Sequence, residues 1–301
     1  MRHRIGITLG DPAGIGPEIV QAALASGRLP ETAEYSVIGS PVVCSLGQPT
    51  HETAHAALDA LEESAARALR GDIQAVVTGP IHKARMYEIG FRFPGQTEFF
   101  ADRCSVKNFA MLLTGGKLTV ALVTTHLPLR AVASALSKDE IVRTGLLLKG
   151  FLHRRQIEKP RIAVAGLNPH AGESGALGRE EIEIITPAIT ELNSQSPIFA
   201  GPFSPDTLFH HAANGDWDGV LCMYHDQGLI PLKLHAFHEG VNVTLGLPFA
   251  RTSPDHGTAF EIAGKGIARA DSMIAAINLA VELTQHTALR ILRAKEVRAS
   301  S

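Results

Sequence analysis

Short apolar runs alternate with longer helix-like segments along the chain of 301 residues, and this alternation limits the fold more than any other feature. A run such as Ile73–Val77 is too short for a helix and is followed by Thr-Gly-Pro. A segment such as His51–Arg70 places its apolar residues at helical spacing. Strands that alternate with helices predict an α/β fold with a mostly parallel sheet.

The predicted elements cover most of the chain, and no linker or internal repeat separates them. We expect strands at Arg4–Leu9, Tyr35–Gly39, Ile73–Val77, Ala110–Leu113, Thr119–Val123, Arg161–Gly166, Gly219–Met223 and Val241–Leu245. We expect helices at Gly16–Ser26, His51–Arg70, Lys138–Gln156, Arg179–Asn193 and Asp271–Leu292. The length allows about two domains, which must share one continuous α/β pattern.

The composition excludes several classes of protein. Hydrophobic residues make up 45% and charged residues 19%, which is typical of a folded globular chain. Lys and Arg number 28 against 30 Asp and Glu, a balance that argues against a general nucleic-acid binder. No apolar run approaches the roughly 18 residues of a membrane span, and no secretory signal is visible. Cys44, Cys104 and Cys222 are widely spaced, so we expect a cytoplasmic protein without disulfides.

Three histidines occur in a repeated context. His126, His170 and His225 each follow an apolar run and precede Pro or Gly. In a parallel sheet the carboxyl ends of the strands form the site, so these imidazoles are expected at one edge. Three neutral imidazoles with an open position suit a catalytic divalent metal. Each histidine taken alone has an alternative structural role as a hydrogen-bonding residue.

A fourth histidine pattern, at His51–His55, has the spacing His-Glu-x-x-His of zinc proteases. It falls where a helix is just starting, and no convincing third ligand follows. The polar first turn of a surface helix is the favoured interpretation, and a zinc protease is the alternative from a different functional class.

Two glycine-rich segments are candidates for ligand contact. Gly10–Glu18 follows the first strand but has Ile19 where a dinucleotide fingerprint needs its third glycine. Asp255–Gly266 combines a glycine-rich loop with a short helix, and the backbone N–H groups of such a loop can bind a phosphate or ribose. Tight turns without a ligand remain the alternative for both.

The Asp255–Gly266 loop resembles the adenosine-binding loop of the isopropylmalate and isocitrate dehydrogenases. Over nearly its whole length the chain more closely resembles the 4-hydroxythreonine-4-phosphate dehydrogenase (PdxA) family. The motifs that carry this resemblance are Gly10–Glu18, Thr78–Lys83, Thr97–Phe100, Thr124–Arg130, Asn168–Glu173, Asp206–Phe209, Tyr224–Gly228 and Asn242–His256.

The resemblance implies a two-domain α/β/α fold with the active site in the interdomain cleft. We expect residues 1–105 together with 246–301 to form a cofactor-side domain, and residues 106–245 to form a metal- and dimer-forming domain. The resemblance also implies a homodimer in which a metal ligand crosses from the partner subunit. No nucleic-acid or membrane partner is expected.

The family's functional residues map onto this chain one by one. The implied ligands of a divalent metal (zinc, magnesium or cobalt) are His126, His170 and His225. The implied substrate contacts are Thr97, Lys233, Asn242 and Arg251, with Gln96 where family members usually have His. The implied contacts of NAD or NADP are His256, Gly257, Thr258, Ala259 and Gly264. The candidate catalytic groups are Asp206, Asp226 and Lys233; the two aspartates could instead be helix caps.

The reaction implied by the family is the oxidation and decarboxylation of 4-phosphohydroxy-L-threonine to 3-amino-2-oxopropyl phosphate in pyridoxal phosphate biosynthesis. Gln96 replaces an ionisable imidazole with a neutral amide, so we expect it to shift substrate preference. The alternatives are a paralogue that acts on D-threonate or D-erythronate 4-phosphate, one that acts on a cyclic dihydrodiol carboxylate, and a non-catalytic binding module.

Overall fold

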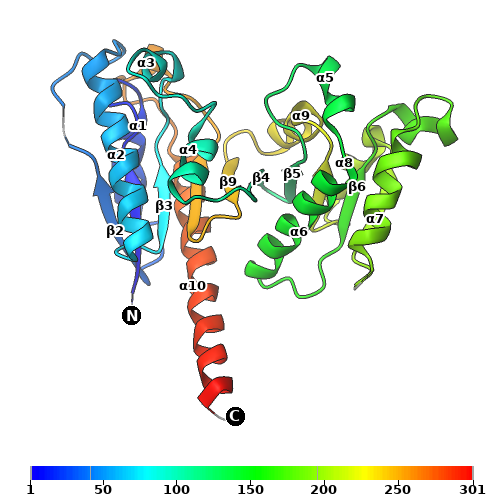
Figure 1. The fold of residues 1–301 in the computed structure, drawn as a ribbon. Coiled ribbons are helices and arrows are strands. Elements are labelled where there is room, and N and C mark those ends of the chain that lie inside the picture. The colour runs from blue at the N-terminus through cyan, green and yellow to red at the C-terminus, as the bar shows by residue number, and fades with distance from the viewer. Residues whose placement is uncertain (1, 41, 195, 300–301) are drawn as a thin grey trace. The chain divides into compact units, whose positions relative to one another are not determined.

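The structure is a computed structural model that describes residues 2–40, 42–194 and 196–299 (Figure 1). The chain divides into two compact units. The first comprises residues 1–107, 241–243 and 247–301, and the second comprises residues 108–240 and 244–246. The cofactor and metal roles expected for the two domains stay predictions.

The first unit is built on parallel strands in the order β2-β1-β3-β10, with strand β9 contributing residues to both units. Its elements are β1 (His3–Thr8), α1 (Gly16–Ala25), β2 (Ala33–Ile38), α2 (His51–Arg70), β3 (Ala75–Thr78), α3 (Lys83–Glu88), α4 (Gln96–Arg103), β10 (Ala250–Pro254), η3 (Phe260–Ile262) and α10 (Asp271–Ala299). Helix α10 packs against β10, β3 and β1. All four residues of β3 are buried, as expected for a central parallel strand.

The second unit has the strand order β4-β5-β8-β6-β7. Its elements are β4 (Ala110–Gly115), β5 (Leu118–Leu122), α5 (Leu129–Ala135), α6 (Lys138–Arg154), β6 (Ile162–Ala165), η1 (Pro169–Gly175), η2 (Glu181–Ile185), α7 (Thr186–Leu192), β7 (Phe199–Phe203), α8 (Pro205–Asn214), β8 (Gly219–Cys222), α9 (His225–Ala236) and part of β9 (Val241–Leu245). Its core contains Leu113, Val120, Leu122, Val220 and Leu232, each almost inaccessible to solvent.

The predicted α/β class is confirmed, and the pairing of β4 with β5 in the second unit departs from the mostly parallel arrangement. Strands β4 and β5 pair antiparallel, because Gly115–Lys117 turns the chain tightly and Gly116 has a φ of +54° there. The predicted helix at His51–Arg70 has the same bounds in the structure. The predicted helix at Arg179–Asn193 begins as the π-helical turn η2 and continues as α7.

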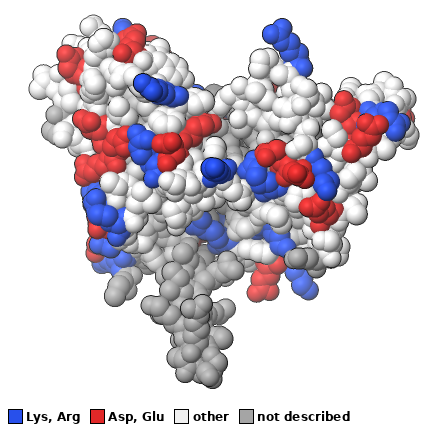
Figure 2. All heavy atoms as spheres, viewed as in Figure 1, with Lys and Arg blue, Asp and Glu red and all other residues white. Residues whose placement is uncertain are grey.

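The surface mixes charges of both signs. On the face drawn in Figure 2, acidic and basic side chains are interspersed, without an extended basic surface among the described residues of that face. Within the described ranges, no helix combines the length and apolar character that spanning a membrane requires.

The start of α2 generates a stability prediction. The Thr50 side chain accepts from Thr53 N at 3.3 Å, and Thr53 Oγ1 accepts from Thr50 N at 3.1 Å, which forms a reciprocal cap. We expect Thr50→Ala to lower the free energy of unfolding by about 1 kcal/mol. Thermal or denaturant unfolding of the variant measures this loss. Thr50→Ser keeps the hydroxyl and should retain most of the stability; equal losses in both variants would show that the cap is not the cause.

Candidate active site

The three predicted metal-ligating histidines all lie just beyond strands of the second unit. His126 follows β5, His170 lies in η1 after β6, and His225 is the first residue of α9 after β8. Strand β8 pairs in parallel with both β5 and β6, so the carboxyl ends of the three strands share one edge of the sheet. The expectation that each histidine follows a strand is confirmed.

Two of these imidazoles are neighbours. The ring centroids of His126 and His225 are 5.6 Å apart. His225 Nδ1 lies 2.7 Å from Asp226 Oδ1. Because an ionised carboxylate can only accept, Nδ1 carries the proton, and a neutral His225 keeps the Nε2 lone pair for another partner. A carboxylate that orients a histidine in this way is a common arrangement around bound zinc.

The third imidazole has a different neighbour. His170 Nδ1 lies 4.0 Å from Asp206 Oδ2 in the first turn of α8. The Ser204 hydroxyl donates to Asp206 and lowers the pKa of its carboxyl, with a smaller contribution from His170. Among the described residues of a single chain, no group of three His, Cys, Asp or Glu side chains is arranged to hold a metal ion. The three-histidine site therefore stays a prediction.

Lys233 and Asp226 both belong to α9. Asp226 is exposed beside His225, and Lys233 is half-buried further along the helix. Asp206 lies in the first turn of its own helix, where a negative charge is stabilised by the helix dipole. The N-caps of α8 and α9 are Ser204 and Tyr224, and neither helix start has a side-chain cap hydrogen bond, so the cap roles weighed for Asp206 and Asp226 are wrong. The catalytic roles of Asp206, Asp226 and Lys233 stay predictions.

Gln96 and Asn242, two of the predicted substrate contacts in the first unit, lie beside Arg251 of β10. This side chain is 2% exposed and lies over the Phe100 ring, 5.6 Å from its centroid. Its Nη2 donates to Thr78 Oγ1 at 2.6 Å, and its Nη1 lies 3.4 Å from Asn242 Oδ1. Burial lowers the pKa of Arg251 to about 9, against an opposing effect of Glu98, so the guanidinium remains charged at neutral pH.

Gln96 contacts Arg251 directly. Its Oε1 accepts from Arg251 Nη2 at 2.9 Å, while its Nε2 donates to Gly79 O at 3.1 Å. Both ends of the carboxamide therefore have protein partners, and the amide orientation is fixed by them. The next residue, Thr97, is 4% exposed in α4.

The predicted cofactor loop packs against the glycine-rich turn at the start of α1. Ile15 N donates to Thr258 O at 2.9 Å, and Gly264 N donates to Glu18 Oε2 at 3.0 Å. A Cβ at Gly14 would lie 2.8 Å from Thr258 O, so glycine is needed for this close approach. The two glycine-rich segments of the sequence thus form one surface of the first unit.

This surface contains polar atoms whose hydrogen bonds are incomplete. His256 Nδ1 lies 3.1 Å from Gly257 O, so Nδ1 is the donor and Nε2 is an acceptor in the neutral ring. Within the described part of the chain, His256 Nε2, Asp11 Oδ2 and Glu18 Oε1 are buried without a hydrogen-bond partner. Buried polar atoms normally have partners, so their lack here is consistent with a segment that binds a polar ligand.

Ala259 and Gly264 complete the predicted loop. Both have positive φ, 43° and 75°. Gly257 is exposed, and a Cβ built on it would meet no atom within 4 Å. The loop therefore has open space in front of Gly257.

The His-Glu-x-x-His pattern lies on the surface, as its favoured interpretation predicted. His51 is the first residue of α2, and its Nε2 pairs with Glu88 Oε2 at 3.0 Å. The Thr50 side chain lowers the pKa of Glu52, which opposes a role as a base. No described residue supplies a third ligand, so the zinc-protease alternative has no structural support.

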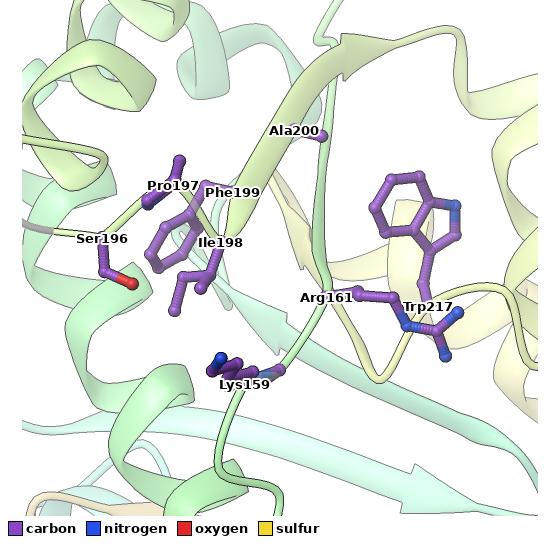
Figure 3. A pocket seen from close by; sticks show the side chains of 9 residues that line it. Lys159, Arg161, Ser196, Pro197, Ile198, Phe199, Ala200 and Trp217 are labelled. Carbon is purple, nitrogen blue, oxygen red and sulfur yellow. The ribbon is translucent and has the colours of Figure 1, made fainter.

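A pocket of about 440 Å³ lies elsewhere in the second unit (Figure 3). Its lining includes Lys159, Arg161, Phe199 and Trp217, from the segments that enter β6 and β7 and from the segment before β8. Figure 3 shows Trp217 and Arg161 among the side chains that line the pocket, and Arg161 is already paired with Asp218. The pocket lies at the amino ends of β6 and β7, opposite the edge that carries the histidines.

Sequence reasoning missed three polar side chains that form hydrogen bonds around the candidate site: Thr78, Gln227 and Glu181. Thr78 contacts Arg251, Gln227 bonds to two strand ends, and Glu181 bonds to the segment before His170. Thr78 and Gln227 stood inside motifs that carried the family resemblance. Glu181 had no sequence signal beyond its place at the start of a helix.

The fold is that of the decarboxylating dehydrogenases. Isocitrate dehydrogenase from Methylococcus capsulatus aligns with a TM-score of 0.53 and 15% identity, covering 95% of this chain and 86% of that chain. A crystal structure of 4-hydroxythreonine-4-phosphate dehydrogenase from Klebsiella pneumoniae aligns with a TM-score of 0.80 and 37% identity, covering 94% of this chain and 99% of that chain.

The sequence comparisons give the family. The profile described as "Pyridoxal phosphate biosynthetic protein PdxA" matches residues 17–280. A 4-hydroxythreonine-4-phosphate dehydrogenase from Caulobacter vibrioides is 44% identical over 93% of this chain and 97% of its own length. A protein from Salmonella typhi, provisionally named D-threonate 4-phosphate dehydrogenase, is 39% identical over 93% of this chain and 98% of its own length. The chain belongs to the PdxA family of oxidoreductases.

The contact between Gln96 and Arg251 predicts a pH effect. In Gln96→His, an imidazole protonated below about pH 6.5 can no longer accept from Arg251 and adds a like charge. We expect the KM of this variant for a phosphorylated substrate to rise, relative to wild type, as the pH falls through that value. In Gln96→Met, loss of one bond to a charged group, about 1.5–3 kcal/mol, should raise KM about 10-fold or more at every pH. If KM had the same pH dependence in wild type and Gln96→His, the contact between residue 96 and Arg251 would not affect substrate binding.

The open space in front of Gly257 predicts a selective effect on the cofactor. A Cβ at Gly257 meets no described atom within 4 Å, so Gly257→Val should leave folding unchanged. The added side chain should obstruct binding of the nicotinamide cofactor. We expect a raised KM for NAD or NADP with unchanged metal affinity, measured by steady-state kinetics and metal titration. Gly150→Val in α6 is the matched control, since a Cβ there also meets nothing within 4 Å. Equal cofactor KM values in both variants would remove the loop from the cofactor site.

Proposed function

We propose that this protein oxidises and decarboxylates 4-phosphohydroxy-L-threonine to 3-amino-2-oxopropyl phosphate with NAD or NADP and a divalent metal. This is a step of pyridoxal phosphate biosynthesis. The observation that carries the proposal is the buried guanidinium of Arg251, held among Thr78, Gln96 and Asn242 in a chain of the PdxA family.

A buried positive charge is unfavourable unless an anion compensates it. The lowered pKa of Arg251 expresses this cost, because burial disfavours the charged form. A phosphate or carboxylate of the substrate is a favourable partner for this buried charge, because the planar guanidinium suits either group. Thr97, Asn242 and Lys233 complete the anion contacts in this proposal.

The histidines fit a divalent metal by the chemistry of their donors. Asp226 fixes the proton of His225 on Nδ1, which leaves Nε2 as a ligand, and the His126 ring lies beside it. His170 is the proposed third ligand. When bound, the metal lowers the pKa of the substrate hydroxyl and stabilises the negative charge that develops during decarboxylation. Zinc, magnesium and cobalt are all compatible with this role, with imidazole favouring zinc or cobalt.

The chain's own residues have three tasks in the reaction. Asp226, or Asp206 beside His170, takes the proton of the substrate hydroxyl or orients the histidine that it contacts. Lys233 donates a proton to the carbon that loses CO₂ or holds an anionic group of the substrate. The loop at His256–Gly264 holds the nicotinamide cofactor, which accepts the hydride.

We further propose a homodimer that shares its metal sites. Helix α9, which begins at His225, exposes Ile230 and Leu234 by 65% and 89%, and Phe237, the residue after the helix, is 70% exposed. Their spacing puts them on one side of the helix, and such an exposed apolar stripe is a feature of subunit interfaces. Leu129, just beyond His126, is 71% exposed. A cytoplasmic location fits the three free cysteines.

A paralogue that acts on D-threonate or D-erythronate 4-phosphate is the second candidate. The observation in its favour is Gln96, which replaces the usual histidine of the family beside Arg251. These acids lack the amino group of 4-phosphohydroxy-L-threonine but retain a carboxylate, a hydroxyl and a phosphate. The anion contacts alone therefore do not separate the two candidates.

A substrate panel separates them. The purified protein is given each phosphorylated acid and a cyclic dihydrodiol carboxylate with NAD or NADP and with zinc, magnesium or cobalt, and reduction of the nicotinamide is followed by absorbance. Preferential turnover of 4-phosphohydroxy-L-threonine supports the proposal. Preference for a threonate or erythronate phosphate selects the second candidate, and lack of turnover of every phosphorylated acid would overturn both.

The shared metal site generates a further prediction. We expect His126→Ala and His170→Ala each to abolish activity and metal binding, because each removes one of three ligands. If His170 comes from the partner subunit, hybrid dimers of the two variants contain one intact site, so an equal mixture should recover about a quarter of the wild-type activity. Activity and metal content of the co-expressed variants measure this recovery. A mixture of His126→Ala with His225→Ala is the control and should stay inactive, and recovery there would contradict the arrangement.

A further inference from the structure

The segment that carries His170 has an unusual backbone. Five consecutive residues of η1 have φ between +44° and +80°; they are His170, Ala171, Gly172, Glu173 and Ser174. Only one of them is glycine, and the left-handed conformation is unfavourable for the other four. Such a turn persists only where the surrounding structure holds it, and functional sites are where this is most often seen.

Glu181 of η2 holds the start of this segment. Its side chain is 3% exposed, and its Oε1 accepts from Leu167 N at 2.8 Å and from Asn168 N at 2.7 Å. Its Oε2 accepts from Asn168 Nδ2 at 3.0 Å. One buried carboxylate thus satisfies two successive backbone N–H groups and fixes the peptide planes from which the left-handed turn begins. Bonds to an ionised acceptor are stronger than neutral ones.

The turn also packs closely on Glu181. A Cβ at Gly172 would lie 2.6 Å from Glu181 Oε2, so the glycine inside the turn permits the approach of the carboxylate. Glu181 therefore contacts the segment before His170 and limits the space available to the segment after it.

Gln227 of α9 holds the same segment from the other side. Its side chain is 6% exposed, and its Nε2 donates to Gly166 O at 2.6 Å. Its Oε1 accepts from Met223 N at 2.6 Å. The carboxamide therefore joins the end of β6, which leads to His170, to the end of β8, which leads to His225.

Met223 extends this connection to the third histidine. Its carbonyl oxygen accepts from Thr124 N at 3.2 Å and from Thr124 Oγ1 at 2.7 Å. Thr124 lies between β5 and His126. A continuous chain of hydrogen bonds runs from Thr124 through Met223 and Gln227 to Gly166, and it links the three strand ends that precede the three histidines.

We propose that Glu181 and Gln227 are positioning residues that fix the left-handed turn carrying His170 on the strand ends of its own subunit, whichever subunit supplies His126 and His225 to the same metal. Neither residue is a metal ligand or a substrate contact in this proposal. The effect on metal binding rests on the proposed function, in which the three histidines are ligands, whereas the effect on the backbone of the turn does not.

The test compares Glu181→Gln and Gln227→Met with matched controls. Glu183→Gln makes the same chemical change on the exposed face of η2, and Gln21→Met does so on the exposed face of α1. Hydrogen exchange of residues 166–176 is measured in the metal-free protein. Cobalt(II) affinity and the visible absorption spectrum of the cobalt-loaded protein are then measured for each variant.

We expect faster exchange in residues 166–176 in both test variants, and also at Met223 N in Gln227→Met, because that variant removes its hydrogen-bond acceptor. The amide introduced by Glu181→Gln offers only a neutral acceptor to the two backbone donors, and the thioether introduced by Gln227→Met replaces neither hydrogen bond of the carboxamide. Cobalt affinity should fall about 10- to 100-fold, as is usual when a residue supporting metal ligands is lost, with an altered spectrum. The two control variants should match wild type. Glu181→Asp, which keeps a carboxylate, should recover part of the protection and of the affinity.

Three results would overturn the proposal. They are unchanged exchange in both test variants, faster exchange with unchanged cobalt affinity and spectrum, and equal effects in the controls. If Glu181→Gln fails to fold, Gln227→Met decides by the same criteria. Failure of the proposed metal function looks different: wild type and His170→Ala would then bind cobalt equally, while the exchange data would still decide whether Glu181 and Gln227 hold the turn.

Discussion

The parallel pairing of β8 with β5 and β6 is the constraint on which the candidate metal site depends. Parallel neighbours bring their carboxyl ends to the same edge, so segments far apart in the sequence emerge together. His126 and His225 need no local spacing rule, because the sheet brings their ring centroids to 5.6 Å, and His170 follows a strand at the same edge. The hydrogen bonds of Met223 and Gln227 then fix the relative positions of the three strand ends more closely than strand pairing alone.

In the first unit the candidate site depends on one buried charged side chain. Arg251 lies in a fully buried strand, and its charge is tolerated because oxygen atoms of Thr78 and Gln96 accept from it. A buried, positively charged side chain whose position is fixed by these hydrogen bonds favours the binding of a small anion. The neutral amide of Gln96 accepts from the guanidinium without adding charge of its own, and it does not titrate near neutral pH.

The sequence predicted the α/β class and most of the elements, because central parallel strands are nearly continuous apolar runs. It did not predict β10, since Ala250–Pro254 is largely polar, or β7, which contains Gly and Pro. Helix α9 was missed because it contains Pro231 and opens with polar residues. The histidines were found through their place after strands, whereas the left-handed turn at His170 has no sequence signal: Ala, Glu and Ser do not favour that conformation. Glu181 acts on backbone groups 13 and 14 residues away, which only the fold brings together.

Helix α9 begins with His225 and carries the exposed stripe of Ile230, Leu234 and Phe237 along its 12 residues and the residue that follows them. A helix of this length is a stiff rod of about 18 Å, so a displacement at one end is transmitted to the other. In a dimer formed through that stripe, the same helix would carry both the subunit interface and the metal ligand His225. Subunit association and metal binding would then each strengthen the other by thermodynamic linkage. The specific activity of such an enzyme would depend on its own concentration, falling on dilution and recovering when metal is in excess.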